Sequence, residues 1–252
     1  MARSSGGANI NTIRPYLGYG NLNYSENSAE SKYHALEAHV LRRFSGGMLF
    51  QVAYTFSKGL ADEEVQDIYD KRSAWGLFSL DRTHMLTLNY VYEFPWLKTR
   101  TDALGRVLGG WQMSGITTFQ SGLPFTVMAP GDRTGTGASS RPNLASDPNQ
   151  DAPHRIDKWF NTEAFVLQPA GFFGNAGSNI IRGPGIANWD LNIFKNIRLT
   201  EDSRLQIGAE FYNLFNHAQF EGVGSGLGTP TFGFLTSARD PRMIQFRVKV
   251  NY

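Results

Sequence analysis

Metal or acid–base chemistry would depend first on the five histidines, and their spacing supports neither. His34 and His39 differ in parity, so on an extended strand their side chains point to opposite faces. His84, His154 and His217 show no spacing that is typical of metal ligands. The sequence has no cysteine, and its Ser, His and acidic residues form no recognisable catalytic grouping. We therefore expect neither a metal site nor an enzyme.

Two short segments match binding loops only in part. Residues 147–151 fit the first three ligand positions of a calcium loop, but Ala152 replaces the turn glycine and Lys158 replaces the bidentate Glu. The glycine-rich residues 222–228 lack the dinucleotide spacing, and no amphipathic helix follows them to bind a phosphate. We expect a flexible loop there, and no cofactor.

The balance of charges excludes another class of partner. There are 24 Lys and Arg residues against 22 Asp and Glu residues, a net charge of +2 without a basic run. A protein that binds nucleic acid normally carries a basic patch or stripe. No nucleic-acid partner is expected.

The elements that must position any functional side chain are β-strands. In residues 242–252 apolar and polar residues alternate, so successive side chains point to opposite faces of a strand. The apolar face carries Ile244, Phe246, Val248, Val250 and Tyr252, and the polar face carries Gln245, Arg247, Lys249 and Asn251.

The same alternation predicts further strands at residues 33–44, 48–57, 84–94, 188–197 and 204–215, and a less regular one at 110–120. Residues 17–25 offer one more, which gives seven or eight strands. The mean hydropathy of −0.33 argues against helical membrane spans, but barrel strands need only alternate. The aromatic fraction of 13% suits rings of aromatic residues at two lipid interfaces.

The connections between these strands alternate between short and long. The short ones lie at 45–47, near 98 and at 200–202, and the long ones at 59–80, 121–187 and 217–239. Bacterial outer-membrane barrels have short periplasmic turns and long external loops. We therefore predict an all-β fold, an antiparallel transmembrane β-barrel segment in contact with outer-membrane lipid.

One domain is expected over residues 1–252, with a poorly defined segment at 1–31. Arg42 and Lys195 interrupt the apolar faces, but both fall near the periplasmic strand ends, where a long cationic side chain can reach the headgroups.

Seven short strings, taken together and in order, resemble the C-terminal half of the barrel in Oar-like TonB-dependent outer-membrane proteins. They are YHALE (33–37), YTFSK (54–58), GGWQMSG (109–115), SGLPF (121–125), RGPG (182–185), NLFNH (213–217) and SARDPR (237–242).

The resemblance covers about residues 33–252. Members of that family are similar to transporters with a 22-stranded barrel, an N-terminal plug and a TonB box. The resemblance implies ligand binding and energised transport, with the remainder of the parent receptor and, through it, TonB as partners. No plug, TonB box or export signal is recognisable in this sequence, so we expect the chain to be the last strands of a longer receptor.

Two other functions stay open. Eight strands suffice to close a small self-contained barrel, with a structural or adhesive role. An outer-membrane enzyme would need Ser, His and acidic side chains that converge on adjacent strands at the rim.

Three groups of residues are functional candidates. Phe246, Val248, Val250 and Tyr252 would form the C-terminal signal for the barrel-assembly machinery, since barrels of this kind typically end on an aromatic residue. The loop at 121–187 would contact a ligand or form a packed lid, with Trp159, Phe160, Phe165, Phe172 and Phe173 as its outward-facing aromatic residues. Arg204, Glu210, Arg247 and Lys249 would face the lumen, either as solvated charges or as substrate contacts.

Overall fold

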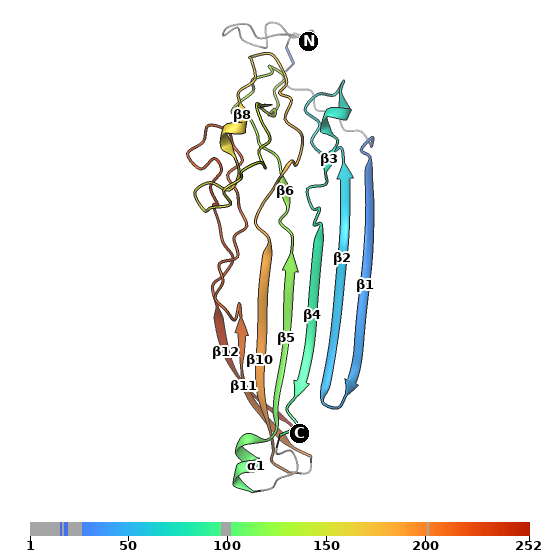
Figure 1. The fold of residues 1–252 in the computed structure, drawn as a ribbon, viewed down its shortest axis with the longest axis vertical. Coiled ribbons are helices and arrows are strands. Elements are labelled where there is room, and N and C mark those ends of the chain that lie inside the picture. The colour runs from blue at the N-terminus through green and yellow to red at the C-terminus, as the bar shows by residue number, and fades with distance from the viewer. Residues whose placement is uncertain (1–15, 17, 20–26, 97–101, 201) are drawn as a thin grey trace.

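A computed structural model describes residues 16, 18–19, 27–96, 102–200 and 202–252. Its main feature is one antiparallel sheet of seven long strands in the order β1-β2-β4-β5-β10-β11-β12 (Figure 1). Their bounds are Ser31–Ser45 (β1), Met48–Ala61 (β2), His84–Glu93 (β4), Trp111–Gln120 (β5), Ile186–Arg198 (β10), Arg204–Tyr212 (β11) and Met243–Asn251 (β12). Each strand pairs with its neighbour in the chain, as in a meander.

The remaining elements are short. Strand β3 (Gly76–Leu77) pairs with the end of β2. Within the longest loop, β6 (Pro124–Phe125) pairs with β9 (Ile181–Arg182), and β7 (Asn143–Leu144) pairs with β8 (Phe165–Val166). In the described part of the chain the helical elements are α1 (Ala103–Leu108) and the 3-10 turns Lys71–Ala74 and Thr162–Ala164. No helix in the described ranges has the length and apolar character that crossing a bilayer requires.

The strands confirm the all-β antiparallel fold expected from the alternation. Each of the seven begins within two residues of its expected start. Strand β11 ends earlier than expected, at Tyr212, because Asn213 takes a positive φ of 51° that a strand does not allow. The predicted strand at residues 17–25 lies almost wholly outside the described residues.

The pairing register brings the apolar residues of all seven strands onto one face. One row across the sheet runs from Phe246 through Ala209, Ile193 and Met113 to Tyr92. Because side chains alternate along every strand, a shift of one residue in any pair would break this row.

The opposite face carries polar rows. Lys249 pairs with Gln206, and Gln206 pairs with Asn196. The Gln206 Nε2 donates to Asn196 Oδ1 at 3.0 Å, and Asn196 Nδ2 donates to Gln112 Oε1 at 3.3 Å. The sheet therefore has one apolar and one polar face, as expected for a strand array between lipid and a watery lumen.

Two residues that break the apolar pattern have local explanations. Gly115 lies under the Tyr90 side chain, and a Cβ at Gly115 would come within 2.6 Å of the tyrosine Oη. Lys195 is only 8% exposed, and its Nζ donates to the carbonyls of Val107 at 2.9 Å and Gly109 at 2.6 Å. The lysine thus binds the carboxyl end of α1, where carbonyl groups lack partners, instead of reaching out to headgroups as expected.

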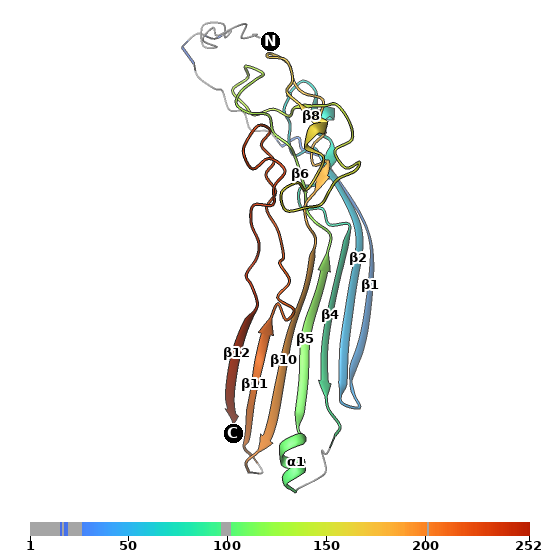
Figure 2. The ribbon, with the colours of Figure 1, turned by 60° about the vertical axis from the view of Figure 1, so that its left-hand side comes forward.

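The two ends of the sheet differ (Figures 1 and 2). The turn between β1 and β2, helix α1 and the turn between β10 and β11 lie at one end, which we call the turn end. Residues 62–83, 121–185 and 213–242 gather at the other, the loop end, and we call them together the cap. The three long connections therefore share one end, as predicted, whereas the connection between β4 and β5 at the other end contains α1 and is longer than the predicted short turn.

The buried core sits in the cap and not in the sheet. Its buried apolar members are Val127, Phe160, Ala164, Phe165, Ala176 and Ile181. Phe232, from the loop before β12, packs against them. The sheet itself buries few side chains, since its two faces have no protein layer over them.

Because the even-numbered residues of β12 lie on the apolar face, an arginine at Val248 should destabilise the inserted sheet by about 2–4 kcal/mol if it reaches the middle of the bilayer. Lys249→Ala on the polar face should have a mild effect. The measurement is folding of the complete gene product into lipid vesicles, and equal losses for Val248→Arg and Lys249→Ala would contradict the assignment of faces.

Candidate functional site

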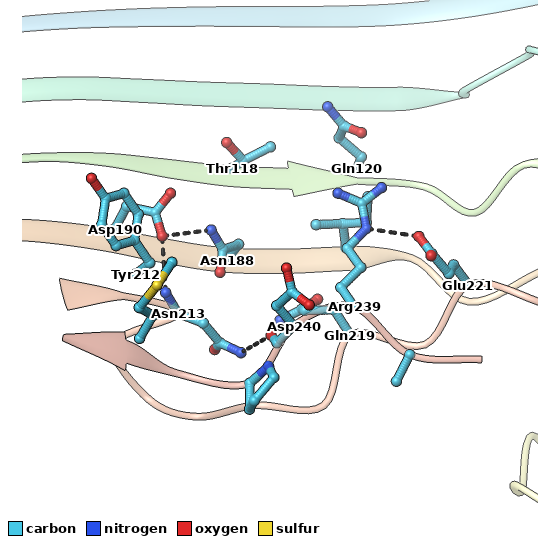
Figure 3. A pocket seen from close by; sticks show the side chains of 14 residues that line it. Thr118, Gln120, Asn188, Asp190, Tyr212, Asn213, Gln219, Glu221, Arg239 and Asp240 are labelled. Carbon is cyan, nitrogen blue, oxygen red and sulfur yellow. Dashed lines mark hydrogen bonds and ion pairs between the residues drawn. The ribbon is translucent and has the colours of Figure 1, made fainter. Parts of the chain in front are cut away.

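A polar cavity of about 600 Å³ lies beside the cap on the polar face of the sheet, and we call it the mouth pocket. Its floor is formed by the loop-end parts of β5, β10 and β11, and its wall by residues 219–241 (Figure 3). Thr118, Gln120, Asn188, Asp190 and Tyr212 point into it from the strands. All five are even-numbered residues of strands whose even positions form the polar face.

Asp190 fixes the wall of the pocket to its floor. Its Oδ1 accepts from the Asn188 Nδ2 at 3.0 Å and from the backbone N–H of Asn213 at 2.9 Å. Gln219, in the loop after β11, makes a similar contact with β10, because its Oε1 accepts from the backbone N–H of Ala187 at 2.9 Å. Hydrogen bonds between side chains and backbone N–H groups therefore join β10 to the loop that follows β11.

The charges around the pocket are mostly negative. Arg239 Nε donates to Glu221 Oε2 at 3.1 Å, and Asp190 and Asp240 supply two further carboxylates. With the amides of Gln120 and Asn188, the pocket offers many hydrogen-bond donors and acceptors, and its lining also includes apolar side chains. Such a lining suits a polar ligand with hydroxyl or amine groups.

Two of the seven strings that carry the family resemblance meet at this pocket. NLFNH (213–217) begins with Asn213, whose Nδ2 donates to the His217 carbonyl at 3.0 Å and the Asp240 carbonyl at 3.4 Å. SARDPR (237–242) ends with Arg242, whose backbone N–H donates to Asn216 Oδ1 at 3.0 Å. Both asparagines have a positive φ, which this residue type tolerates better than most.

Two other strings also pair with each other. SGLPF (121–125) contains β6, and RGPG (182–185) begins with the last residue of β9, so Pro124 lies opposite Arg182. A Cβ at Gly122 would lie 1.8 Å from the Gly183 carbonyl oxygen, so only glycine allows the two segments to come this close. Segments that are about sixty residues apart in the chain thus pair with each other at the loop end of the sheet.

Buried polar contacts join the loops of the cap. Arg182 forms an ion pair with Asp81, whose carboxylate is fully buried and also accepts from the Gly59 N–H at 2.6 Å. Arg141, only 2% exposed, donates to the carbonyls of Glu64 at 2.9 Å and Ser73 at 2.6 Å. Burial lowers the pKa of Arg141, and the charges of Glu64 and Asp70 oppose that shift.

The loop aromatics named from the sequence divide into two groups. Phe160 is 1% and Phe165 5% exposed, so the expectation that they face outward is wrong for both. Their rings pack edge-on against each other and against Phe232. Trp159 packs at the edge of this core, and its Nε1 donates to the Arg182 carbonyl at 2.7 Å.

Phe172, 48% exposed, and Phe173, partly buried, lie outside this core. Of the five aromatics, Phe172 keeps the most surface for a ligand. The region predicted as one loop is a folded unit, and a role in ligand contact remains a prediction.

The lumen charges partly neutralise one another. Glu210 accepts from Arg247 at 3.2 Å and from the Tyr212 hydroxyl at 3.1 Å. Arg247 also lies over the Phe194 ring, 5.7 Å from its centroid. Arg204 and Lys249 lie exposed near the turn end, away from the mouth pocket.

The C-terminal candidates form an unobstructed apolar row on β12 and at the residue that follows it. Phe246 is 83%, Val248 72% and Val250 52% exposed, and Tyr252 is fully exposed. They share the apolar face, so they are accessible from outside the sheet. Recognition by the assembly machinery remains a prediction.

The weak sequence matches correspond to ordinary structure. Asp147 accepts from the Asn149 backbone N–H at 2.9 Å, which makes residues 147–149 a turn, and Lys158 pairs with Glu163 at 2.9 Å. His84 shares a hydrogen bond of 2.8 Å with the Tyr54 hydroxyl on the neighbouring strand. Within the described ranges no three His, Asp or Glu side chains gather as a metal site would require.

Sequence reasoning missed most of the mouth pocket. The alternation in residues 188–197 predicts that Asn188 and Asp190 share the polar face, but nothing in the sequence links them to Gln219 or Arg239, about thirty to fifty residues later. The two asparagines of NLFNH were the available signal, since Asn is enriched at positive φ and marks a sharp exit from a strand.

A comparison with known protein families matches residues 2–245 to the outer membrane beta barrel domain. Comparisons with curated proteins and with solved structures gave no match. The two-faced antiparallel sheet, with short turns at one end and long loops at the other, agrees with this family. The chain therefore belongs to the family of outer membrane beta barrel domains, and it resides in the bacterial outer membrane.

Proposed function

We propose that the chain forms part of an Oar-like TonB-dependent receptor, and that it takes part in binding a ligand and transporting it across the outer membrane. The observation that carries this is the meeting of the strings that resemble that family. The two strings meet at the mouth pocket, which is lined by Asn213 of NLFNH (213–217) and by residues 238–241 of SARDPR (237–242), and hydrogen bonds join them.

The mouth pocket is the proposed ligand contact. It lies on the polar face, beside the cap, where a ligand that enters from outside would first meet the lumen. Its carboxylates and amides favour a polar ligand, and Met243 and Ile186 in its lining offer apolar contacts.

Coupling to TonB would come from the plug of the parent receptor. In this proposal the chain supplies the ligand-facing wall, and the plug supplies the energised step. Insertion would depend on the barrel-assembly machinery, which would read the exposed row from Phe246 to Tyr252.

A structural or adhesive barrel is the second candidate, and the packed cap favours it. A cap with a buried aromatic core and an ion pair of Arg182 with the buried Asp81 is a packed surface rather than an open mouth. Only the receptor needs TonB, so binding to TonB distinguishes the two candidates.

The cap should face the outside of the cell, because long loops are external in this family. Ser146 is exposed on the cap, and Ser45 is exposed at the turn end. On intact cells Ser146→Cys should react with a membrane-impermeant maleimide, whereas Ser45→Cys should react only after the outer membrane is disrupted. The reverse pattern would overturn the topology.

The complete gene product should bind the periplasmic domain of TonB. We expect the solubilised protein to be retained on an immobilised TonB periplasmic domain from the same bacterium, as a known receptor from that outer membrane is retained. Failure to bind while the known receptor binds would reject transport through TonB and favour the structural or adhesive role.

A further inference from the structure

Both outer strands of the sheet are unpaired on one side within the described residues. Strand β1 pairs only with β2, and β12 pairs only with β11. They lie on opposite sides of the sheet in both ribbon views (Figures 1 and 2). Each therefore presents a row of backbone N–H and C=O groups without a strand partner.

A lipid bilayer does not tolerate such edges. The hydrocarbon core has no water to satisfy backbone groups, so spanning strands must be paired on both sides. Neither β1 nor β12 contains a proline or glycine that would blunt the edge. Apolar side chains on both strands are exposed as well, since Leu36 on β1 is 65% and Phe246 on β12 is 83% exposed.

The direction of the strands decides what can cover these edges. Each of the seven long strands is antiparallel to the next, so the first and the last run the same way, from the loop end to the turn end. Direct pairing of β12 with β1 would place two parallel strands side by side. The same holds for two copies of this sheet in one membrane orientation, because every free edge runs in the same direction.

Bacterial single-chain barrels are antiparallel throughout and have an even number of strands. We infer that an odd number of further strands, contributed from outside residues 31–252, lies between β12 and β1. The strands next to both edges run from the turn end to the loop end. This inference rests on the barrel family and the sheet, and it stands whether or not the chain binds a ligand.

The edges also define the chemistry of the missing partner. Opposite Leu36 and Val40 on β1 the partner carries apolar residues, because these positions face lipid. Opposite Glu37 and His39 it carries residues that tolerate a polar lumen. The partner of β1 is therefore an alternating strand, and not a soluble protein or a helix.

Photo-cross-linking in the complete gene product tests this inference. A benzoylphenylalanine is placed at Leu36 or at Val40, and cross-linked peptides from outer membranes are identified by mass spectrometry. Both variants should reach β2, near Phe56 for the first and near Val52 for the second, which serves as the internal control.

The expected second set of cross-links lies outside residues 31–252. When the probe moves from Leu36 to Val40, this second site should move by about four residues toward the N-terminus of the partner, as antiparallel pairing requires. The same probe at Phe246 and Val250 of β12 should reach Ala209 and Leu205 on β11, and again a second strand outside residues 31–252.

Three results would overturn the inference. They are cross-links between β1 and β12, within one chain or between copies; a second site that moves toward the C-terminus of its partner; and cross-links to β2 and β11 alone. Heat-modifiable migration on gels shows that each variant has folded, so an absent cross-link cannot be the result of misfolding.

Discussion

The whole structure depends on one constraint, the pairing of backbone groups where water is absent. In a bilayer every spanning N–H and C=O needs a partner in the protein, and every side chain that faces lipid must be apolar. Strands with a two-residue alternation meet both demands only if their registers agree. The row from Phe246 to Tyr92 shows that they do across five consecutive strands. A slip of one residue between any two strands would place polar side chains in lipid.

The same constraint explains why the packed core lies in the cap. The sheet has lipid on one face and the lumen on the other, so it cannot bury side chains against a second protein layer. The loops project beyond the strands and bury Phe160, Phe165 and Ile181 among themselves. Arg141 and the pair of Arg182 with Asp81 then join loops that are distant in the chain. This packed cap includes the wall of the mouth pocket, which lies beside the polar face.

The strands were predictable from the sequence, and the cap was not. Alternation is a local signal, so the positions of β1, β2, β4 and β12 could be read directly from it. The cap depends on contacts between distant segments, such as β6 with β9, which leave no period in the sequence. Phe160 and Phe165 are also covered by residues that are distant in the chain, such as Phe232, and the sequence does not reveal those contacts. Lys195 could be placed at the strand end, but its partner, α1, was not foreseen.

The central claim is that the even-numbered residues of β12 face lipid and the odd-numbered ones face the lumen. Nitroxide labels at successive positions from 243 to 250, in the complete gene product in lipid vesicles, measure this directly through collisions with oxygen, which enters lipid, and with a water-soluble nickel complex. The account predicts that oxygen accessibility peaks at Ile244, Phe246, Val248 and Val250, and that nickel accessibility peaks at the positions between them. Accessibility to both reagents without alternation, or with the two sets exchanged, would contradict it.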